Sequence, residues 1–324
     1  MSHMANPLAT PDQLFQRRSF GALPTELQDT IFFATQCLTQ AAGILLELPQ
    51  SLTAQANVLL ARYWLVEPML AHEFSDVSAA VLYLTTKCSG HPRSPRDLSN
   101  VYAYLLSPSS SLFRPPPTSP PPPGPIHNNP SAYYVSESAY HAFHTRLLAL
   151  EARVLYALSF DTHVSLPHPL AVTYLQALDF LNVRQEIIGR RTVQYLNTAL
   201  LSPQMLYLTS QPNALAVAAI YNAARDVGAK MPECEWWEVF DVDREELGFL
   251  VVGMRSVEGS GRKMREEVMK GWGSGMLTRR DVEEELGRRG ISVGVGNGGG
   301  AHYDAEEEAA RRMDEKMAEM EAAS

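Results

Sequence analysis

The chain has 324 residues, of which 45% are hydrophobic and 19% are charged, and its net charge is −9 at pH 7. This composition fits a globular protein with room for two modest domains, and it excludes a bilayer-spanning protein because no apolar run is long enough. Eight acidic and three basic residues between positions 303 and 324 supply five of the nine excess negative charges. The rest of the chain is therefore close to neutral and has no basic stripe, so we expect no direct binding of nucleic acid.

The first four residues (MSHM) look like the remnant of an expression tag, and residues 1–23 are assigned to a segment before the folded domains. The three cysteines, Cys37, Cys88 and Cys234, are odd in number, far apart and without a CxxC pair. They indicate a reducing compartment, the cytosol or nucleus, and neither a disulfide framework nor a zinc site.

Helical periodicity dominates the chain that follows. Apolar residues recur at three- and four-residue spacing in Glu26–Leu48, which Pro49 ends, and again in Ser51–Val66, with Pro68 just beyond. Alternating segments bounded by tight-turn residues are absent from the sequence. We therefore predict an all-α fold.

A third apolar helix ends at Lys87, which is the only lysine before Lys230. A cation in the last turn of a helix interacts favourably with the helix dipole, and this needs no further function. The segment Ser75–Lys87 also overlies Asn213–Arg225 at an offset of 138 residues. Ser75 and Asn213 are both expected to cap their helices, and the small residues between suit close packing. The repeat predicts two similar helical domains, each with one central helix.

A proline-rich stretch interrupts the helices from Ser107 to Pro130, and helical periodicity resumes at Ser136. Its composition favours extended polyproline II. We expect a solvated surface loop inserted in the first domain, and recruitment of an SH3- or WW-type partner is the alternative.

Glycine and charge rise together after Glu258. The segment Val293–Gly300 (VGVGNGGG) is expected to be a flexible linker, since neither an apolar helix nor an acidic partner follows as in a phosphate-binding loop. The final charged segment is expected to be disordered or to become helical on a partner.

No catalytic constellation is recognisable, because GxSxG, Walker A and kinase signatures are all absent. His141 and His144 lie one helical turn apart but have no third ligand, which disfavours a metal site. The segment Asp241–Leu247 begins like a calcium loop but lacks the glycine and the closing glutamate. Asp243 and Glu246 instead mark the start of a helix. We expect no cofactor, no metal and no catalysis.

Glu151 lies within a strongly apolar segment, Arg146–Asp161. A solvated position on an amphipathic helix is the simplest interpretation. If this helix lies beside the one that ends at Lys87, however, the two opposite charges would form a surface pair able to hold a partner's backbone.

Several segments resemble the cyclins, and most closely the L-type cyclins. Leu38–Gln50 (LTQAAGILLELPQ) resembles the first-helix segment of that group almost residue for residue. Lys87 falls at the position of the cyclin-box lysine, at the end of the third helix, and Glu151 at that of the cyclin-box glutamate in the fifth. Phe160–Leu178 resembles the passage into the second box, and the whole match covers about Pro24–Val257.

The resemblance implies two tandem five-helix cyclin boxes, at residues 24–163 and 164–258. The proline-rich insertion, residues 107–130, then lies in the first box, and a flexible tail occupies residues 259–324.

The resemblance also implies a regulatory subunit that binds and activates a cyclin-dependent kinase as a heterodimer. In the family the lysine and glutamate hold the backbone of the kinase's regulatory helix region, which helps to seat the helix whose glutamate pairs with the ATP-binding lysine. Carried over by position, these residues are Lys87 and Glu151, with Cys88, Leu155 and Phe160 as apolar neighbours. A nuclear location, a role in RNA polymerase II transcription or pre-mRNA splicing, and further splicing or transcription factors as partners are implied as well.

Some residues depart from the L-type pattern. Cys88, Ser89 and Gly90 stand where acidic residues are usual, and an arginine-serine-rich tail is absent from the sequence, although Arg96 and Asp97 are retained. The alternatives are a K-, T- or C-type transcriptional cyclin and a cyclin-fold adaptor of the general transcription factor type, which binds polymerase or DNA without a kinase. An enzyme is a remote third.

Overall fold

A computed structural model describes residues 5–19, 23–107, 110, 112, 134–180, 186–268 and 276–291. Most of the proline-rich stretch, the linker Val293–Gly300 and the acidic tail lie outside these residues. Within them the regular secondary structure is entirely helical, which confirms the all-α prediction. The elements are α1 (Pro11–Ser19), α2 (Thr25–Leu45), α3 (Gln50–Val66), η3 (Met69–Ala71), α4 (Phe74–Lys87), α5 (Pro95–Leu106), α6 (Glu137–Ala157), α7 (Pro167–Ala177), α8 (Glu186–Ala199), α9 (Leu206–Thr209), α10 (Pro212–Val227), η5 (Glu238–Phe240), α11 (Arg244–Lys263), the π-helix η6 (Met264–Val268) and α12 (Arg279–Arg288).

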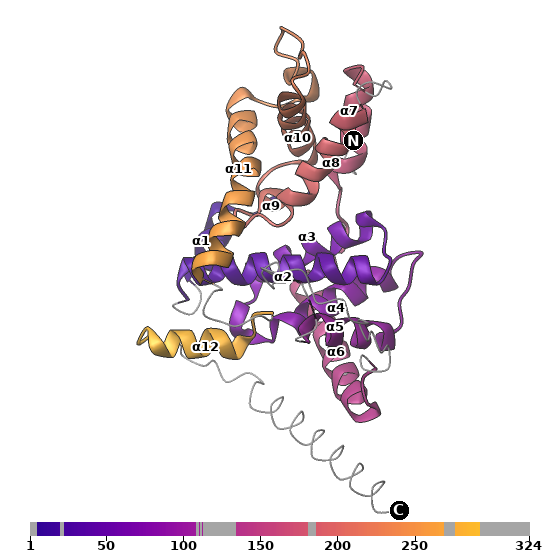
Figure 1. The fold of residues 1–324 in the computed structure, drawn as a ribbon, viewed down its shortest axis with the longest axis vertical. Helices are drawn as coiled ribbons and strands as arrows, with labels where there is room; N and C mark the ends of the chain where they lie inside the picture. Colours follow the sequence, from indigo (N-terminus) through magenta and orange to yellow (C-terminus); the bar gives the residue numbers. More distant parts are fainter. Residues whose placement is uncertain are drawn as a thin grey trace, which may run out of the picture.

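The first bundle comprises α2 to α6, with α4 at its centre. Helix α4 packs against α2, α3, α5 and α6, and its middle is completely buried at Ala79, Ala80, Val81 and Leu82. The two alanines let neighbouring helices approach closely, so burial of apolar surface on every side holds α4 in place. Figure 1 shows this bundle, with α2 to α5 in purple and α6 in magenta, below the second.

The second bundle comprises α7 to α11 and is built around α10. Helix α10 packs against α7, α8 and α11, and Ala216, Ala218 and Ala219 are fully buried. The repeat detected in the sequence therefore corresponds to two equivalent central helices. Within the described residues each bundle has five helices, as predicted, and the short α9 completes the second.

The helix starts differ from the prediction at both repeated segments. The N-cap of α4 is Glu73, whose carboxylate accepts a hydrogen bond from the Phe74 amide, so Ser75 lies inside the first turn. The N-cap of α10 is Gln211, because Pro212 at the first helical position extends the helix backwards past Asn213. Asp243 does occupy the N-cap position of α11, but its side chain makes no capping hydrogen bond.

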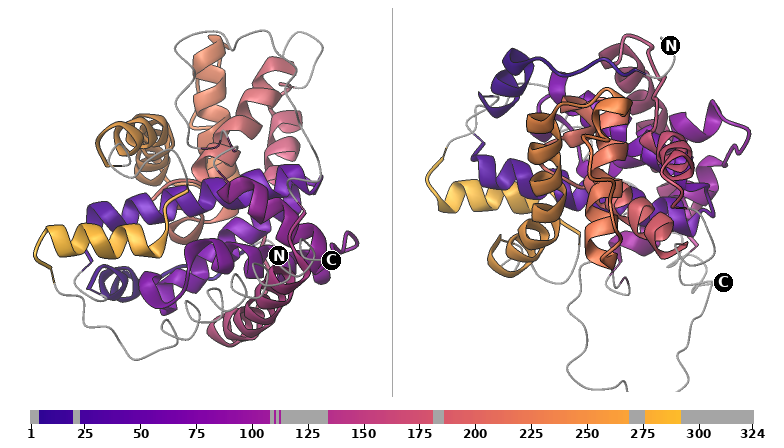
Figure 2. Two further views of the ribbon diagram at one scale, coloured as in Figure 1. Left: turned by 60° about the horizontal axis from the view of Figure 1, so that its bottom comes forward. Right: turned by 90° about the horizontal axis from the view of Figure 1, so that it is seen from above.

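The chain's described ends pack onto the first bundle. Helix α1 contacts α3, and α12 lies beside α2 although it follows the second bundle in sequence (Figure 1 and Figure 2). The predicted boundary between residues 258 and 259 falls inside α11, which continues to Lys263. Among the described residues, no helix has the length and hydropathy needed to cross a membrane.

Candidate functional site

Lys87 and Glu151 meet on one face of the first bundle. The Lys87 Nζ donates a hydrogen bond to Glu151 Oε1 at 2.9 Å, joining the last turn of α4 to the middle of α6. The lysine side chain is 55% exposed, whereas that of the glutamate is 9% exposed. The glutamate is therefore not the solvated residue that a simple amphipathic pattern suggests: it lies beneath the ammonium group and holds it at the surface.

The pair keeps a positive charge at this surface. The hydrogen bond to Glu151 is the largest of the contributions that raise the pKa of Lys87. The Lys87 Nζ also lies 5.5 Å from the centroid of the Tyr83 ring, close enough for a cation–π interaction. Since an ammonium has three donors, two remain for a partner's carbonyl groups.

A second ion pair fixes α6 against α4. Arg146 Nε lies 2.9 Å from Asp76 Oδ2, and these side chains are only 17% and 15% exposed. The two pairs join the helices near both ends of α4, so the orientation of α6 is fixed at two points.

The other predicted residues lie on or after α6 and at the end of α4. Cys88 is exposed, Leu155 is half-buried, and Phe160 is 63% exposed. Phe160 has a φ of 62°, in the left-handed region, in the turn that follows α6. Such a backbone conformation is unfavourable for a non-glycine residue and is held here by the surrounding turn.

Two exposed apolar residues of this surface escaped the sequence analysis. Tyr156 is 73% exposed and contacts the Phe160 ring edge-on, with 5.5 Å between centroids. Leu148 is 40% exposed and lies eight residues earlier on α6. Their spacing of eight residues, flanking Glu151, is a signal that could have found them.

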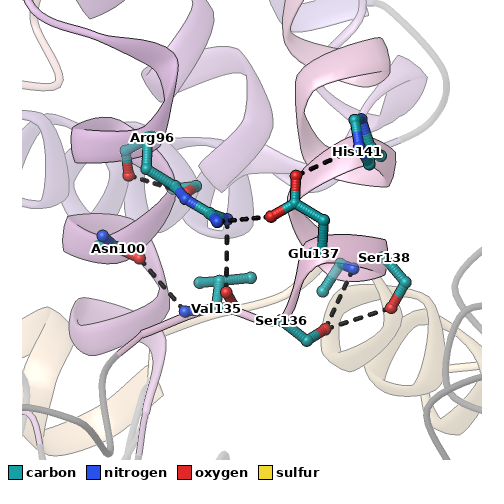
Figure 3. A network of polar contacts seen from close by, with 9 residues as sticks. Arg96, Asn100, Val135, Ser136, Glu137, Ser138 and His141 are labelled. Carbon is teal, nitrogen blue, oxygen red and sulfur yellow. Dashed lines mark hydrogen bonds and ion pairs between the residues drawn. The ribbon is translucent and has the colours of Figure 1, made fainter. Parts of the chain in front are cut away.

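The start of α6 is anchored to α5 by the polar network in Figure 3. Arg96 Nη2 lies 2.6 Å from Glu137 Oε2, and Asn100 Oδ1 accepts a hydrogen bond from the Val135 amide at 3.2 Å. Ser136 caps the helix by accepting from the Ala139 amide. This network places the first turn of α6 where the chain returns from the proline-rich stretch.

One of the two histidines considered as metal ligands pairs with a carboxylate of its own helix. His141 Nε2 lies 3.3 Å from Glu137 Oε1 on the surface of α6. No group of three or more metal-ligating side chains occurs among the described residues.

Sequence comparison identifies cyclins as relatives, although no protein-family model matches the chain. An uncharacterized cyclin-L1-like protein of Schizosaccharomyces pombe is 33% identical over 211 residues, which are 65% of this chain and 76% of that protein. Cyclin-L1 of Gallus gallus is 30% identical over 221 residues, 68% of this chain and 38% of that protein. Human Cyclin-L2 is 29% identical over 246 residues, 75% of this chain and 43% of that protein. The chain thus spans less than half the length of these animal relatives.

Structure comparison finds the same fold in two kinase complexes. A chain of the yeast RNA Pol II CTD kinase CTDK-1 complex matches with a TM-score of 0.61 at 13% identity, covering 93% of this chain and 89% of that one. A chain of the CAK complex of Chaetomium thermophilum bound to ATP-gamma-S matches with a TM-score of 0.57 at 14% identity, covering 86% and 84%. At these identities the likeness establishes the fold.

Proposed function

Since the chain belongs to the cyclin family, we propose that it is the non-catalytic regulatory subunit of a cyclin-dependent kinase. The relatives are named as cyclins of the L type, and the structures that share the fold come from kinase complexes. Both observations support a kinase as the partner.

The observation that carries the proposal is the pair formed by Lys87 and Glu151. Its ammonium group lies at the surface, held by a nearly buried carboxylate. The free N–H donors of Lys87 would bind carbonyl groups at the end of the kinase's regulatory helix. Charge-assisted hydrogen bonds of this kind are stronger than neutral ones.

Apolar side chains beside the pair would supply most of the buried area. Tyr156, Phe160 and Leu148 are all exposed in the chain as it stands, and aromatic residues are the usual centres of binding energy at interfaces. Together with Cys88 and Leu155 they would pack against the kinase and help to orient the helix whose glutamate pairs with the ATP-binding lysine.

The biological setting forms a finer part of the proposal. The L-type names of the relatives and the RNA Pol II CTD kinase complex among the structures favour a kinase of the transcription machinery. We extend the proposal to pre-mRNA splicing and to a nuclear location, with splicing or transcription factors as further partners.

The test is affinity capture from nuclear extract with the kinase identified and its activity assayed. We expect Lys87→Ala combined with Glu151→Ala to abolish capture of the kinase. The matched control is Lys230→Ala combined with Glu233→Ala, which removes a pair with both side chains 86% exposed and should leave capture intact.

Two outcomes would contradict the proposal. Undiminished capture and activation by the double variant would show that this surface is not the interface. Binding of DNA with a steep dependence on salt, together with no kinase in the captured material, would favour the adaptor alternative.

A further inference from the structure

Residues 276–291, called the C-terminal strap from here on, form an integral part of the first bundle. Its apolar side chains are buried: Met276 and Leu277 are 6% and 2% exposed, and Val282 and Leu286 are 0% and 1% exposed. At its far end Arg289 lies 3.6 Å from Glu26, at the start of α2. The strap therefore runs beside α2, as the left view of Figure 2 shows.

One carboxylate joins the strap to the central helix. Glu73 is the N-cap of α4 and accepts a hydrogen bond from the Phe74 amide at 3.2 Å. Its two oxygens also accept from the amide of Arg279, the first residue of α12, at 3.3 and 3.2 Å. Glu73 thus satisfies free amides at the N-terminal ends of two helices, where a negative charge is favourable.

The neighbouring residue extends this connection to α6. His72 is only 5% exposed, and its Nε2 lies 3.3 Å from Arg153 Nη1. Arg153 is on α6, two residues after Glu151 and two before Leu155. A continuous set of contacts therefore leads from the strap through Glu73 and His72 to Arg153, in the same half of α6 as Glu151 but on a different side of the helix.

We propose that docking of the C-terminal strap positions α6 for kinase binding, with Glu73 and His72 as the positioning residues. This inference rests on the proposed function. The start of α6 is held by Arg96 and its middle by the Asp76–Arg146 pair. The contact to His72 is a second anchor of its second half, beside the Lys87–Glu151 pair. When the strap is released, the kinase must order that half of the helix on binding, and this lowers the affinity.

The experiment uses the full chain and measures the dissociation constant for the kinase that the chain captures. Leu286→Asp places a charge in the buried face of α12 and should release the strap, and we expect it to weaken binding about tenfold. His72→Leu removes the contact to Arg153, and His72 is too buried for a partner to contact it directly. We expect this variant to weaken kinase binding as well, but by less than Leu286→Asp. Arg280→Ala is the control and should bind normally, because the Arg280 side chain on α12 is 87% exposed.

Hydrogen exchange separates positioning from general destabilisation. We expect both variants to lose protection in the second half of α6, residues 147–157, while α3 keeps its protection. Normal kinase affinity in both variants, with Lys87→Ala and Glu151→Ala still abolishing binding, would overturn the inference and leave the proposed function standing. Loss of protection throughout the first bundle would overturn it as well, because the strap would then be a general stabiliser.

Discussion

The two members of the Lys87–Glu151 pair contribute unequally to stability because they are unequally exposed. Removing the lysine leaves a carboxylate that is 9% exposed without its hydrogen-bond donor, whereas removing the charge of the glutamate leaves a lysine that water can solvate. Unsatisfied buried groups cost more than lost surface pairs.

We therefore predict that Lys87→Ala lowers the free energy of unfolding by about 1–3 kcal/mol. Glu151→Gln, which keeps an oxygen for Lys87, should lower it by less than about 1 kcal/mol. Urea unfolding of the unbound chain measures both values. Equal losses would show that the carboxylate is not dependent on its partner.

His72 and Glu73 are adjacent, and their pKa values are shifted in opposite directions. Burial raises the pKa of Glu73 to about 7, with Asp76 adding to the rise and the amides of Arg279 and Phe74 and the Arg279 guanidinium opposing it. Burial, Arg153 and Arg279 lower the pKa of His72 to about 4. Between pH 4.5, the ordinary pKa of this carboxyl, and pH 7, Glu73 keeps its proton in the folded chain but loses it in the unfolded chain. The contribution of Glu73 to stability therefore falls as the pH rises towards 7. His72 has the opposite effect: below pH 6.5 its ring takes up a proton in the unfolded chain but not in the folded chain, so its contribution to stability falls as the pH is lowered.

The two effects oppose each other over nearly the same pH range, and single variants should separate them. We predict that Glu73→Gln makes the loss of stability on acidification from pH 6.5 to 4.5 larger than in the unaltered chain, because the opposing titration of Glu73 is removed while that of His72 remains. His72→Leu should change the slope in the opposite direction, so that this variant is more stable at pH 4.5, relative to pH 6.5, than the unaltered chain. Thermal unfolding at closely spaced pH values measures the slopes. Parallel profiles for the two variants would contradict the assignment.

At the scale of elements, the contact between α2 and α3 depends on the glycine in AAGILLEL. A Cβ built on Gly43 would lie 2.6 Å from the Thr53 Cγ2, so the Thr53 side chain of α3 occupies the space that a side chain at position 43 would need.

We predict that Gly43→Ala destabilises the chain by about 1–3 kcal/mol through overpacking. Adding Thr53→Ala to that variant should restore part of the loss. Gly248→Ala in α11 is the matched control, because no atom lies within 4 Å of its added Cβ, and it should stabilise by about 0.5–1 kcal/mol. A neutral Gly43→Ala would show that the two helices can separate without cost.

The helices that could be predicted are those with a strong apolar period and a clear stop. Pro49 and Pro68 mark the ends of α2 and α3 to within four residues, and Lys87 ends α4 as expected. The opposite charges of Lys87 and Glu151 suggested a surface pair only on condition that their helices are neighbours, since neither periodicity nor spacing relates two helices in space. The cyclin resemblance supplied that condition. Their role towards a kinase stays a prediction.

Helices α1 and α12 were not predicted from the sequence, because each has only a few apolar residues among many polar ones. Helix α12 (RRDVEEELGR) buries only Val282 and Leu286, and α1 (PDQLFQRRS) is equally polar. Two apolar residues in ten residues are too weak a signal to indicate docking onto a bundle distant in sequence. Ser75 and not Glu73 was predicted as the cap of α4. The second hydrogen-bond partner of Glu73, the amide of Arg279, is more than 200 residues away in the sequence and could not be foreseen.

At the scale of the whole molecule, polar side chains join the two bundles. Gln40 Nε2 donates to Gln50 Oε1 at 2.6 Å, and Gln50 Nε2 donates to Asn197 Oδ1 at 3.1 Å. Asn197 Oδ1 also lies 3.0 Å from His168 Nε2. Gln40 and Gln50 belong to LTQAAGILLELPQ, so this most cyclin-like segment also sets the contact between the bundles.

The N-terminal segment adds a second connection at this junction. Asn6 is 6% exposed. Its backbone amide and carbonyl pair with the side chain of Gln211, at the start of α10, both at 3.0 Å. The side chain of Asn6 donates a hydrogen bond to the Ser165 carbonyl and accepts one from the Ser165 amide, each at 2.8 Å, and Ser165 lies between the bundles. One residue therefore ties the passage between the bundles to the central helix of the second.

We predict that Asn6→Asp weakens this connection more than its size suggests. The Asn6 Nδ2 that donates to the Ser165 carbonyl would become a carboxylate oxygen, and two acceptors would then face each other at a nearly buried position. The expected loss is about 1–3 kcal/mol in the free energy of unfolding. Because the two bundles share this contact, we also expect a single unfolding transition to separate into two, with faster proteolysis between residues 161 and 166. Calorimetry and limited proteolysis measure these effects, and Asn213→Asp, which alters contacts within the second bundle only, is the control. If Asn6→Asp unfolds in one transition at the normal temperature, the contacts of Asn6 are not needed to hold the bundles together.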